Sequence, residues 1–234
     1  FLNNKFILDT SANYIIQNDK NMVSQGQYFN PLTSLYLFPR GEDFSDVAVY
    51  ERYDDLSGVN TQYWPYGDLG GVSSQNPYWI MNRMNRENDR RRYKLAASLQ
   101  YNIIEGLNVQ GRVSIDNTES KYTEKFHAGT VGNFAGPKGR YKEENRLDRQ
   151  VYADVLANFN KTFNEFNVTA NLGASIKDLR MELTSLHGDL NNVTNHFTIE
   201  NLTRSGYYKV NADGLKRQTQ SVFANAEIGW RSFL

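Results

Sequence analysis

Cysteine is absent from the 234 residues, so the chain can form neither a disulfide framework nor a thiolate metal site. Net charge is absent too, because 26 lysine and arginine residues balance 26 aspartate and glutamate residues. A broad basic field is what attracts nucleic acid, so we expect no nucleic-acid partner. No run reaches the roughly 18–20 consecutive apolar residues of a membrane helix, and the mean hydropathy is −0.65.

This polar composition leaves membrane strands possible, because a barrel strand alternates lipid-facing and water-facing residues and averages to a polar segment. Alternation with a period of two is the strongest pattern in the sequence, and residues 93–103 show it most clearly. Their apolar face consists of Tyr93, Leu95, Ala97, Leu99, Tyr101 and Ile103. The intervening residues are polar or small, as expected for a strand with one face in water.

The same pattern recurs in other segments and predicts six strands in all. The apolar rows cover residues 6–16, 93–103, 107–115, 151–163, 166–176 and 222–230. Each row is close to the roughly 9–11 residues with which a tilted strand crosses a bilayer. We therefore expect an all-β fold: an antiparallel, up-and-down transmembrane β-barrel segment of about six strands.

The connections alternate in length. Glu105 with Gly106, and Asn164 with Glu165, form minimal turns, whereas residues 18–90, 119–147 and 181–217 are long and polar. Outer-membrane barrels have short turns on the periplasmic side and long loops on the outer side. The sequence therefore predicts an outer-membrane location, with outer-membrane lipid against the apolar face.

Aromatic residues on the apolar face lie close to the predicted turns and chain ends. They are Phe6, Tyr101, Phe159, Phe163, Phe166 and Trp230. A shared height near the turns is typical of the aromatic girdle at a membrane interface. Strand propensity alone explains the residue types, but not their common height.

Six strands are too few to close a barrel, since about eight is the smallest number. We therefore expect residues 1–234 to belong to one larger barrel domain, with further strands outside this chain. Residues 1–6 lack the features of a signal peptide, so we expect an exported protein to begin upstream.

Three segments resemble the SusC/RagA family of TonB-linked transporters from Bacteroidetes. One is Asn76, Pro77, Tyr78 and Trp79 with the following Asn82 and Arg83; another is Leu35, Tyr36, Leu37, Phe38, Pro39 and Arg40. The third is the strand from Leu107 through Gly111 and Arg112 to Asp116. The family often carries tryptophan at the turn where this chain has Gly106, a departure that weakens one girdle position.

The resemblance implies TonB-dependent import of oligosaccharides or peptides through a plugged barrel of about 22 strands. It also implies a SusD-like surface lipoprotein over the outer mouth and contact with TonB through an N-terminal region. That region and the plug would lie outside this chain. The alternative from another class is a β-rich binding or adhesion module without transport. Such a β-sandwich would bury its apolar faces against each other and would not align aromatic residues at one end.

Aromatic side chains in the longest loop are the candidates for substrate binding. Sugar rings are held by aromatic faces together with amide and carboxylate partners, and Trp64, Tyr66, Tyr78 and Trp79 lie among such residues. The competing interpretation is that these side chains pack the loop onto itself or onto a lipoprotein partner. The sequence favours this second interpretation.

The polar face of the strands would line the lumen or touch the plug. Its candidate residues are Gln100, Asn102, Gln110, Arg112 and Asp116. We expect Arg112 to contact the plug, because an unpaired charge inside the barrel would be costly.

Motifs for catalysis, phosphate binding and metal binding are absent, so the sequence predicts a protein that is not an enzyme and needs no cofactor. The histidines His127, His187 and His196 lack the spacing of metal ligands.

Overall fold

The computed structural model describes residues 5–23, 26, 28–66, 75–203 and 209–231. Six long strands dominate it: β1 (Phe6–Lys20), β4 (Met84–Ile104), β5 (Leu107–Phe126), β6 (Arg140–Phe163), β7 (Phe166–Asp189) and β8 (Lys209–Trp230). Shorter elements lie between them: α1 (Pro31–Tyr36), η1 (Phe44–Ala48), β2 (Glu51–Asp54), β3 (Val59–Gln62), α2 (Pro77–Arg83) and η2 (Ile199–Asn201). Among the described residues, no helix is long and apolar enough to cross a membrane.

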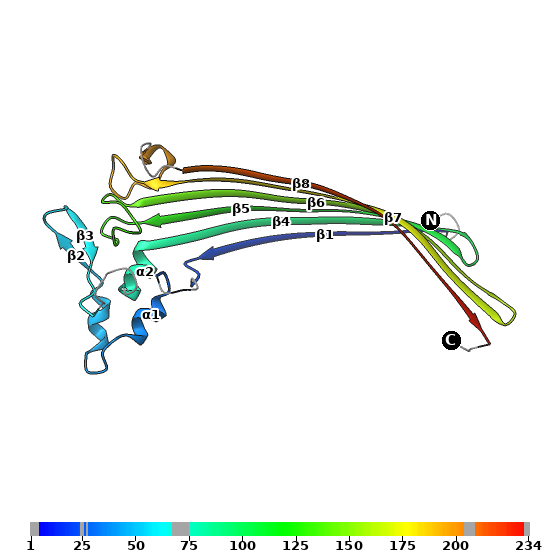
Figure 1. Ribbon diagram of the computed structural model, residues 1–234, viewed down its shortest axis with the longest axis horizontal. Helices are drawn as coiled ribbons and strands as arrows, with labels where there is room; N and C mark the ends of the chain where they lie inside the picture. Colours follow the sequence, from blue (N-terminus) through cyan, green and yellow to red (C-terminus); the bar gives the residue numbers. More distant parts are fainter. Residues whose placement is uncertain (1–4, 24–25, 27, 67–74, 204–208, 232–234) are drawn as a thin grey trace.

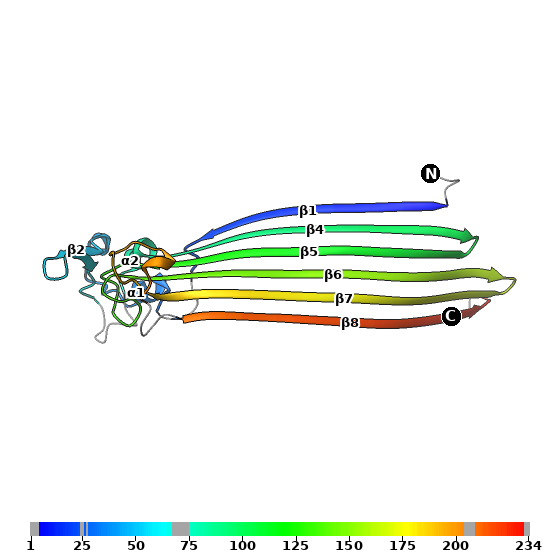
Figure 2. The same ribbon diagram turned by 90° about the horizontal axis from the view of Figure 1, so that it is seen from above.

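The long strands form one antiparallel sheet in the order β1-β4-β5-β6-β7-β8, so each strand pairs with the next long strand along the chain. Figures 1 and 2 show a long, curved and open sheet, with the hairpin turns gathered at one end and the shorter elements at the other. This is the predicted up-and-down, all-β arrangement of six strands. The sheet is a barrel-like wall that is not closed.

The strands run well beyond their predicted limits at the end opposite the turns. β4 begins at Met84 and β5 ends at Phe126, inside segments that the sequence analysis assigned to loops. In these parts both faces of the strands carry polar side chains, so the alternation of apolar and polar residues stops. The backbone pairing of β4 with β5 nevertheless continues. The loops are correspondingly shorter than predicted, and residues 67–74 and 204–208 of the predicted loops lie outside the described residues.

Two tight turns fix the register of the hairpins. Gly106 has φ +86° and Asn164 has φ +51°, the left-handed conformation that two-residue hairpin turns require. Glycine and asparagine adopt it more readily than other residues. The turn at Asn164 pairs Phe163 with Phe166, as the alternation predicted. At the other turn a register shift between Asn102 and Ile104 pairs Ile104 with Leu107, whereas the alternation had placed Ile103 in the row that continues at Leu107.

One face of the sheet, the apolar face, carries every apolar row. Leu8, Leu99, Gly111, Val155, Ala174 and Val222 occupy one line of cross-strand neighbours. Many of these side chains are exposed, Leu8 at 66% and Val222 at 79%. The apolar face therefore has no layer packed over it within the described residues.

The apolar rows cross the strands obliquely. The row of β1 reaches Ile16, whose line of partners leads to Arg91, Glu119, Leu147 and Glu182, already past the apolar rows of those strands. The end of the apolar row farther from the turns therefore moves toward the turns across the sheet, from Ile16 on β1 to Val222 on β8. A level band on tilted strands must shift in this way, and tilt is what a barrel requires.

Aromatic residues gather at the turn end of the apolar face. Phe6 stacks on Tyr101 with ring centroids 4.5 Å apart, and Phe166 pairs with Trp230 across β7 and β8. Trp230 also donates from Nε1 to Glu165 in the turn, at 3.3 Å. The predicted girdle residues therefore lie together on neighbouring strands.

Candidate functional site

The shorter elements at the far end pack into one unit, which we call the cap and define as residues 28–66, 75–83, 127–139 and 190–203. Its inner layer packs Trp79, Ile80 and Ala135 against the strand-end residues Met84 of β4 and Phe126 of β5, with Phe29, Tyr50 and Phe134 against this layer. A second apolar cluster joins Tyr141, Leu190 and Leu202 to Phe197. The cap therefore has a core of its own, unlike the apolar face of the sheet.

Asn76 organises the start of α2. Its Oδ1 accepts from the backbone N–H of Tyr78 at 2.8 Å, which caps the helix, and Pro77 follows at the first helical position. Its Nδ2 donates to the carbonyls of Val47 at 2.9 Å and Tyr63 at 3.1 Å. The Asn-Pro segment therefore ties α2 to η1 and to the residue after β3.

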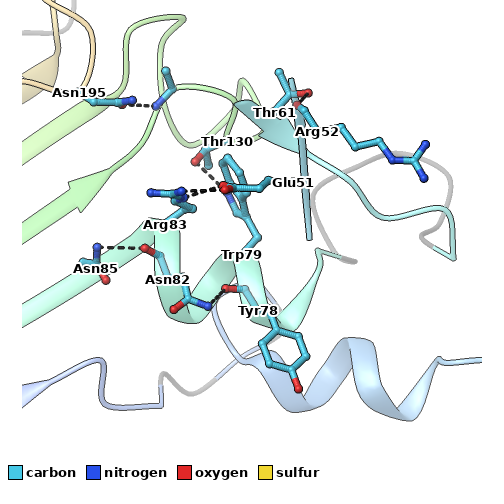
Figure 3. A network of polar contacts seen from close by, with 11 residues as sticks. Glu51, Arg52, Thr61, Tyr78, Trp79, Asn82, Arg83, Asn85, Thr130 and Asn195 are labelled. Carbon is cyan, nitrogen blue, oxygen red and sulfur yellow. Dashed lines mark hydrogen bonds and ion pairs between the residues drawn. The ribbon is translucent and has the colours of Figure 1, made fainter. Parts of the chain in front are cut away.

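Trp79 lies at the centre of the cap. Its side chain is fully buried, and its Nε1 donates to Thr130 Oγ1 at 3.1 Å (Figure 3). A side chain with no exposed surface offers no face for a ligand to stack on. The structure therefore assigns Trp79 to loop packing, the second of the two interpretations that the sequence left open.

An ion pair fastens the β2–β3 hairpin to α2 (Figure 3). Arg83 donates from Nε and Nη2 to the two carboxylate oxygens of Glu51, at 2.7 and 2.8 Å. These hydrogen bonds hold the pKa of Glu51 below its usual range. The sequence singled out Arg83 within a family motif but gave no signal for its partner, because the two residues are 32 positions apart.

His127 lies beside this ion pair. Burial, followed by the nearby charge of Arg83, lowers the pKa of His127 to about 4, although Glu51 acts in the opposite direction. Its ring meets Phe197 edge to face, with centroids 4.9 Å apart. His127 is thus a neutral packing residue that joins two loops, and the described residues contain no group of side chains that could hold a metal.

The other three aromatic candidates lie nearer the surface of the cap. Trp64 and Tyr66 meet edge to face at 5.5 Å, and Phe38 contacts both of them. Tyr78 stacks on Tyr50 with ring centroids 6.4 Å apart, outside that group. The structure therefore brings Trp64 and Tyr66 together. These two residues and Tyr78 are partly exposed, whereas Trp79 is buried.

Three loops that are distant in sequence meet in the cap. Ala128 donates its backbone N–H to Asn195 Oδ1 at 2.7 Å, and Gly136 donates to Asp189 Oδ1 at 3.0 Å. Gln62 donates its backbone N–H to the carbonyl of Gly129 at 3.2 Å. The long loops therefore form one connected structure rather than three independent ones.

The opposite face of the sheet, the polar face, carries the second candidate site. A groove of about 600 Å³ lies on β4, β5 and β6 near the cap. Its residues are Asn88, Arg90, Arg92, Thr118, Ser120, Tyr122, Lys142, Glu144, Arg146 and Asp148. The sequence analysis missed this groove, because alternation has already stopped at this level and polar residues occupy both faces.

Three of the four cations in the groove are paired. Arg92 binds Asp116 at 2.6 Å, Lys142 binds Glu144 at 3.0 Å, and Arg146 binds Asp148 at 2.7 Å. Arg90 forms no ion pair with any residue that the structure describes. Its guanidinium is therefore the group in this groove best able to accept an anionic partner.

A second groove of about 500 Å³ lies lower on the polar face. Arg112 lies there and donates to both carboxylate oxygens of Asp154, whose side chain is fully buried. Asp154 on the next strand already compensates the charge of Arg112, so this charge is not unpaired. The plug contact of Arg112 stays a prediction.

The remaining polar-face candidates also find partners within the sheet. Gln100 is the cross-strand neighbour of Gln110 and donates to Asn102 Oδ1 at 3.0 Å. Asp116 accepts from Arg92, which lies between the predicted loop and the predicted apolar row of this strand. All five candidates lie on the polar face. Of the five, only Asp116 forms an ion pair with a residue of the groove near the cap, Arg92.

Comparison with known proteins identifies the fold. No family model and no curated protein matches the chain. Among solved structures, the RagAB peptide transporter superposes with a TM-score of 0.73 at 12% identity, over 99% of this chain and 25% of that chain. The chain has the fold of a segment of this transporter.

Two further structures of the RagAB peptide importer agree. Its closed-closed state gives a TM-score of 0.66 over 99% of this chain, and its open-open state gives 0.63 over 96%, both at 14% identity. The chain spans about a quarter of each matched protein. The likeness at this level of identity is one of fold.

Proposed function

We propose that the chain forms part of the wall of an outer-membrane, TonB-dependent importer of the SusC/RagA type that takes up peptides or oligosaccharides. The observation that carries this proposal is the superposition of nearly the whole chain on the RagAB peptide transporter. The exposed apolar face, its aromatic end and the grooved polar face support it. In this proposal the apolar face meets lipid and the polar face lines the lumen.

Peptides are the cargo that we favour. The matched structures are those of a peptide transporter and a peptide importer. The groove on β4, β5 and β6 near the cap offers chemistry that suits a peptide. Arg90 can bind a carboxylate, while Asn88 and Ser120 can exchange hydrogen bonds with backbone amides. Oligosaccharides lack the carboxylate terminus that would use Arg90.

The cap is the proposed contact for a SusD-like surface lipoprotein. Several of its apolar side chains are highly exposed, among them Tyr36 at 89% and Leu56 at 99%. Exposed apolar residues that form a patch on the protein surface are typical of an interaction surface. TonB would act through the plug and other regions outside this chain.

The aromatic residues Trp64, Tyr66 and Tyr78 remain proposed substrate contacts at the cap. Each offers part of its ring to solvent, and an aromatic contact contributes on the order of 0.5–1.5 kcal/mol beyond its buried area. Changing Tyr78 to Ala should therefore lower cargo affinity several-fold and leave barrel assembly unchanged. An unchanged affinity together with a lost lipoprotein partner would assign Tyr78 to the protein interface instead.

Uptake by intact cells tests the function. Cells that lack the whole protein should lose import of fluorescent peptides and regain it with the wild-type gene. The variant Arg90→Gln should reduce that import several-fold, whereas the matched Arg91→Gln on the apolar-face side should leave it near wild type. Normal import of both peptides and oligosaccharides by the deletion strain would refute an import function.

Labelling tests the orientation. Single cysteines at Asn133 in the cap and at Asn164 in a turn, placed in the whole protein, should differ in their reaction with an impermeant maleimide on intact cells. Asn133 should react and Asn164 should not, because the cap would face outside and the turn the periplasm. Labelling only at Asn164 would reverse the topology.

A further inference from the structure

Three cations form a row across β6, β7 and β8. Arg149 is the direct cross-strand neighbour of Arg180, which is in turn the neighbour of Lys216. All three belong to the same face as the apolar rows, because Arg149 is two residues from Val151 on β6. The row is therefore on the outer side of the wall rather than on the polar, grooved side.

Like charges directly opposite each other on a sheet repel, since their Cβ atoms are about 4.5–5.5 Å apart. Only one of the three has its charge compensated: Arg180 pairs with Glu182 on its own strand. Neither Arg149 nor Lys216 forms an ion pair with any other residue in the described parts of the chain. All three side chains are exposed. An anion placed between neighbours would relieve this repulsion.

The row lies beyond the apolar surface, next to it on β6 and farther from it on β7 and β8. The apolar rows end at Val151 on β6, Ile176 on β7 and Val222 on β8, each on the turn side of its cation. Arg149 follows its row directly, whereas Asp178 stands between Ile176 and Arg180, and Gln220 and Gln218 stand between Val222 and Lys216. A lipid molecule lying with its chains on the apolar rows would bring its headgroup to the cations.

We propose that Arg149, Arg180 and Lys216 bind a phosphate group of the anionic glycolipid in the outer leaflet. Arginine pairs with phosphate through two parallel hydrogen bonds, and lysine adds a point charge. Basic clusters at the membrane surface recognise anionic headgroups in this way. The inference rests on the proposed membrane location and is independent of the cargo.

Binding of lipid A to the purified whole protein in detergent tests this site. Bis-phosphorylated and dephosphorylated lipid A are compared, with EDTA present so that no divalent cation on Asp178 or Glu182 can bridge to the phosphate. The double variant Arg180→Gln with Lys216→Gln should weaken binding of phosphorylated lipid A about 30-fold, since each cation near an anionic headgroup contributes a factor of about five. The single variant Arg149→Gln should weaken it about fivefold.

The matched control is the double variant Lys177→Gln with Arg217→Gln, which removes the same charges from the same two strands but on the polar face. Its affinity should stay within about twofold of wild type, because these residues face away from the lipid. Equal losses in both double variants, or equal binding of both lipids by wild type, would overturn the site. A protein that binds phosphorylated lipid A selectively yet imports nothing would refute only the proposed function.

Discussion

The cap and the sheet differ in how their apolar side chains are removed from water. In the cap, Trp79 and Val47 are completely buried by other parts of the same chain. On the apolar face of the sheet, Val222 and Ile228 are 79% and 69% exposed, although they are just as apolar. Burial of such side chains is the main favourable contribution to folding.

The contrast shows where each region obtains its stability. The cap resembles a small soluble domain, with its own core, helix caps and ion pair. The four inner strands of the sheet have a ladder partner on both sides. The apolar face of the sheet, by contrast, needs an apolar medium or partner. Changes in the cap should therefore act locally, whereas changes on the apolar face should act on assembly.

The largest expected effect comes from removing the centre of the cap. Trp79→Ala should cost about 3–5 kcal/mol, because it leaves a cavity and an unpaired Thr130 hydroxyl. Hydrogen exchange on the whole protein should show faster exchange in the cap and unchanged protection in β5 to β7. The half-buried Trp64→Ala is the control and should cost less. Equal loss of protection in the strands would show that the two regions are not independent.

The second effect separates the two faces of one strand. Leu99→Arg places a charge in the middle of the apolar row and should cost roughly 2–4 kcal/mol in a bilayer. Gln100→Arg, on the polar face of the same strand, should leave assembly nearly intact. The folded fraction in lipid vesicles, measured by heat-dependent gel mobility, checks the pair. Identical losses for both variants would contradict the two-faced wall.

The smallest effect is a pH dependence confined to the cap. Unfolded His127 binds a proton near pH 6.5, whereas in the folded cap its pKa is lowered to about 4. The unfolded state therefore binds more protons in this window, so cap stability is complete above pH 6.5 and falls toward pH 4. The loss is on the order of 2 kcal/mol, and the lowered pKa of Glu51 adds to it below about 4.5.

Proteolysis of the cap measures this dependence. Cleavage in the cap should accelerate as the pH falls from 6.5 to 4, and the variant His127→Gln should lose most of the change. Strand cleavage should not follow the same curve. A pH profile that is identical in wild type and His127→Gln would show that this histidine does not link the cap to pH.

Alternation allowed much of the sheet to be predicted. Leu95, Leu99 and their neighbours revealed the strands, and Gly106 and Asn164 revealed the turns, because these signals are local in sequence. The upper halves of the strands were missed because Arg90 and Arg91 are both polar and give no period. In these halves the strands pair because the hydrogen-bond ladder continues from the alternating halves next to the turns. A pattern that is local in sequence cannot indicate such pairing.

The candidate sites were predicted less completely, because partners come from distant segments. Nothing near Arg83 pointed to Glu51, and nothing near Arg112 pointed to Asp154. Tyr78 and Trp79 are adjacent in a helix and looked alike in sequence. Their difference in burial depends on Thr130 and the other loops, which only the folded cap brings together.

The most direct test of a wall with one face in lipid is a scan along β4 in vesicles. Single cysteines at positions 93 to 103 of a cysteine-free version of the whole protein would carry nitroxide labels. Odd positions such as Leu95 and Leu99 should collide with oxygen dissolved in lipid, and even positions such as Ser98 and Gln100 with a water-soluble nickel complex. Equal access of the nickel complex to both sets would contradict a lipid-facing apolar surface.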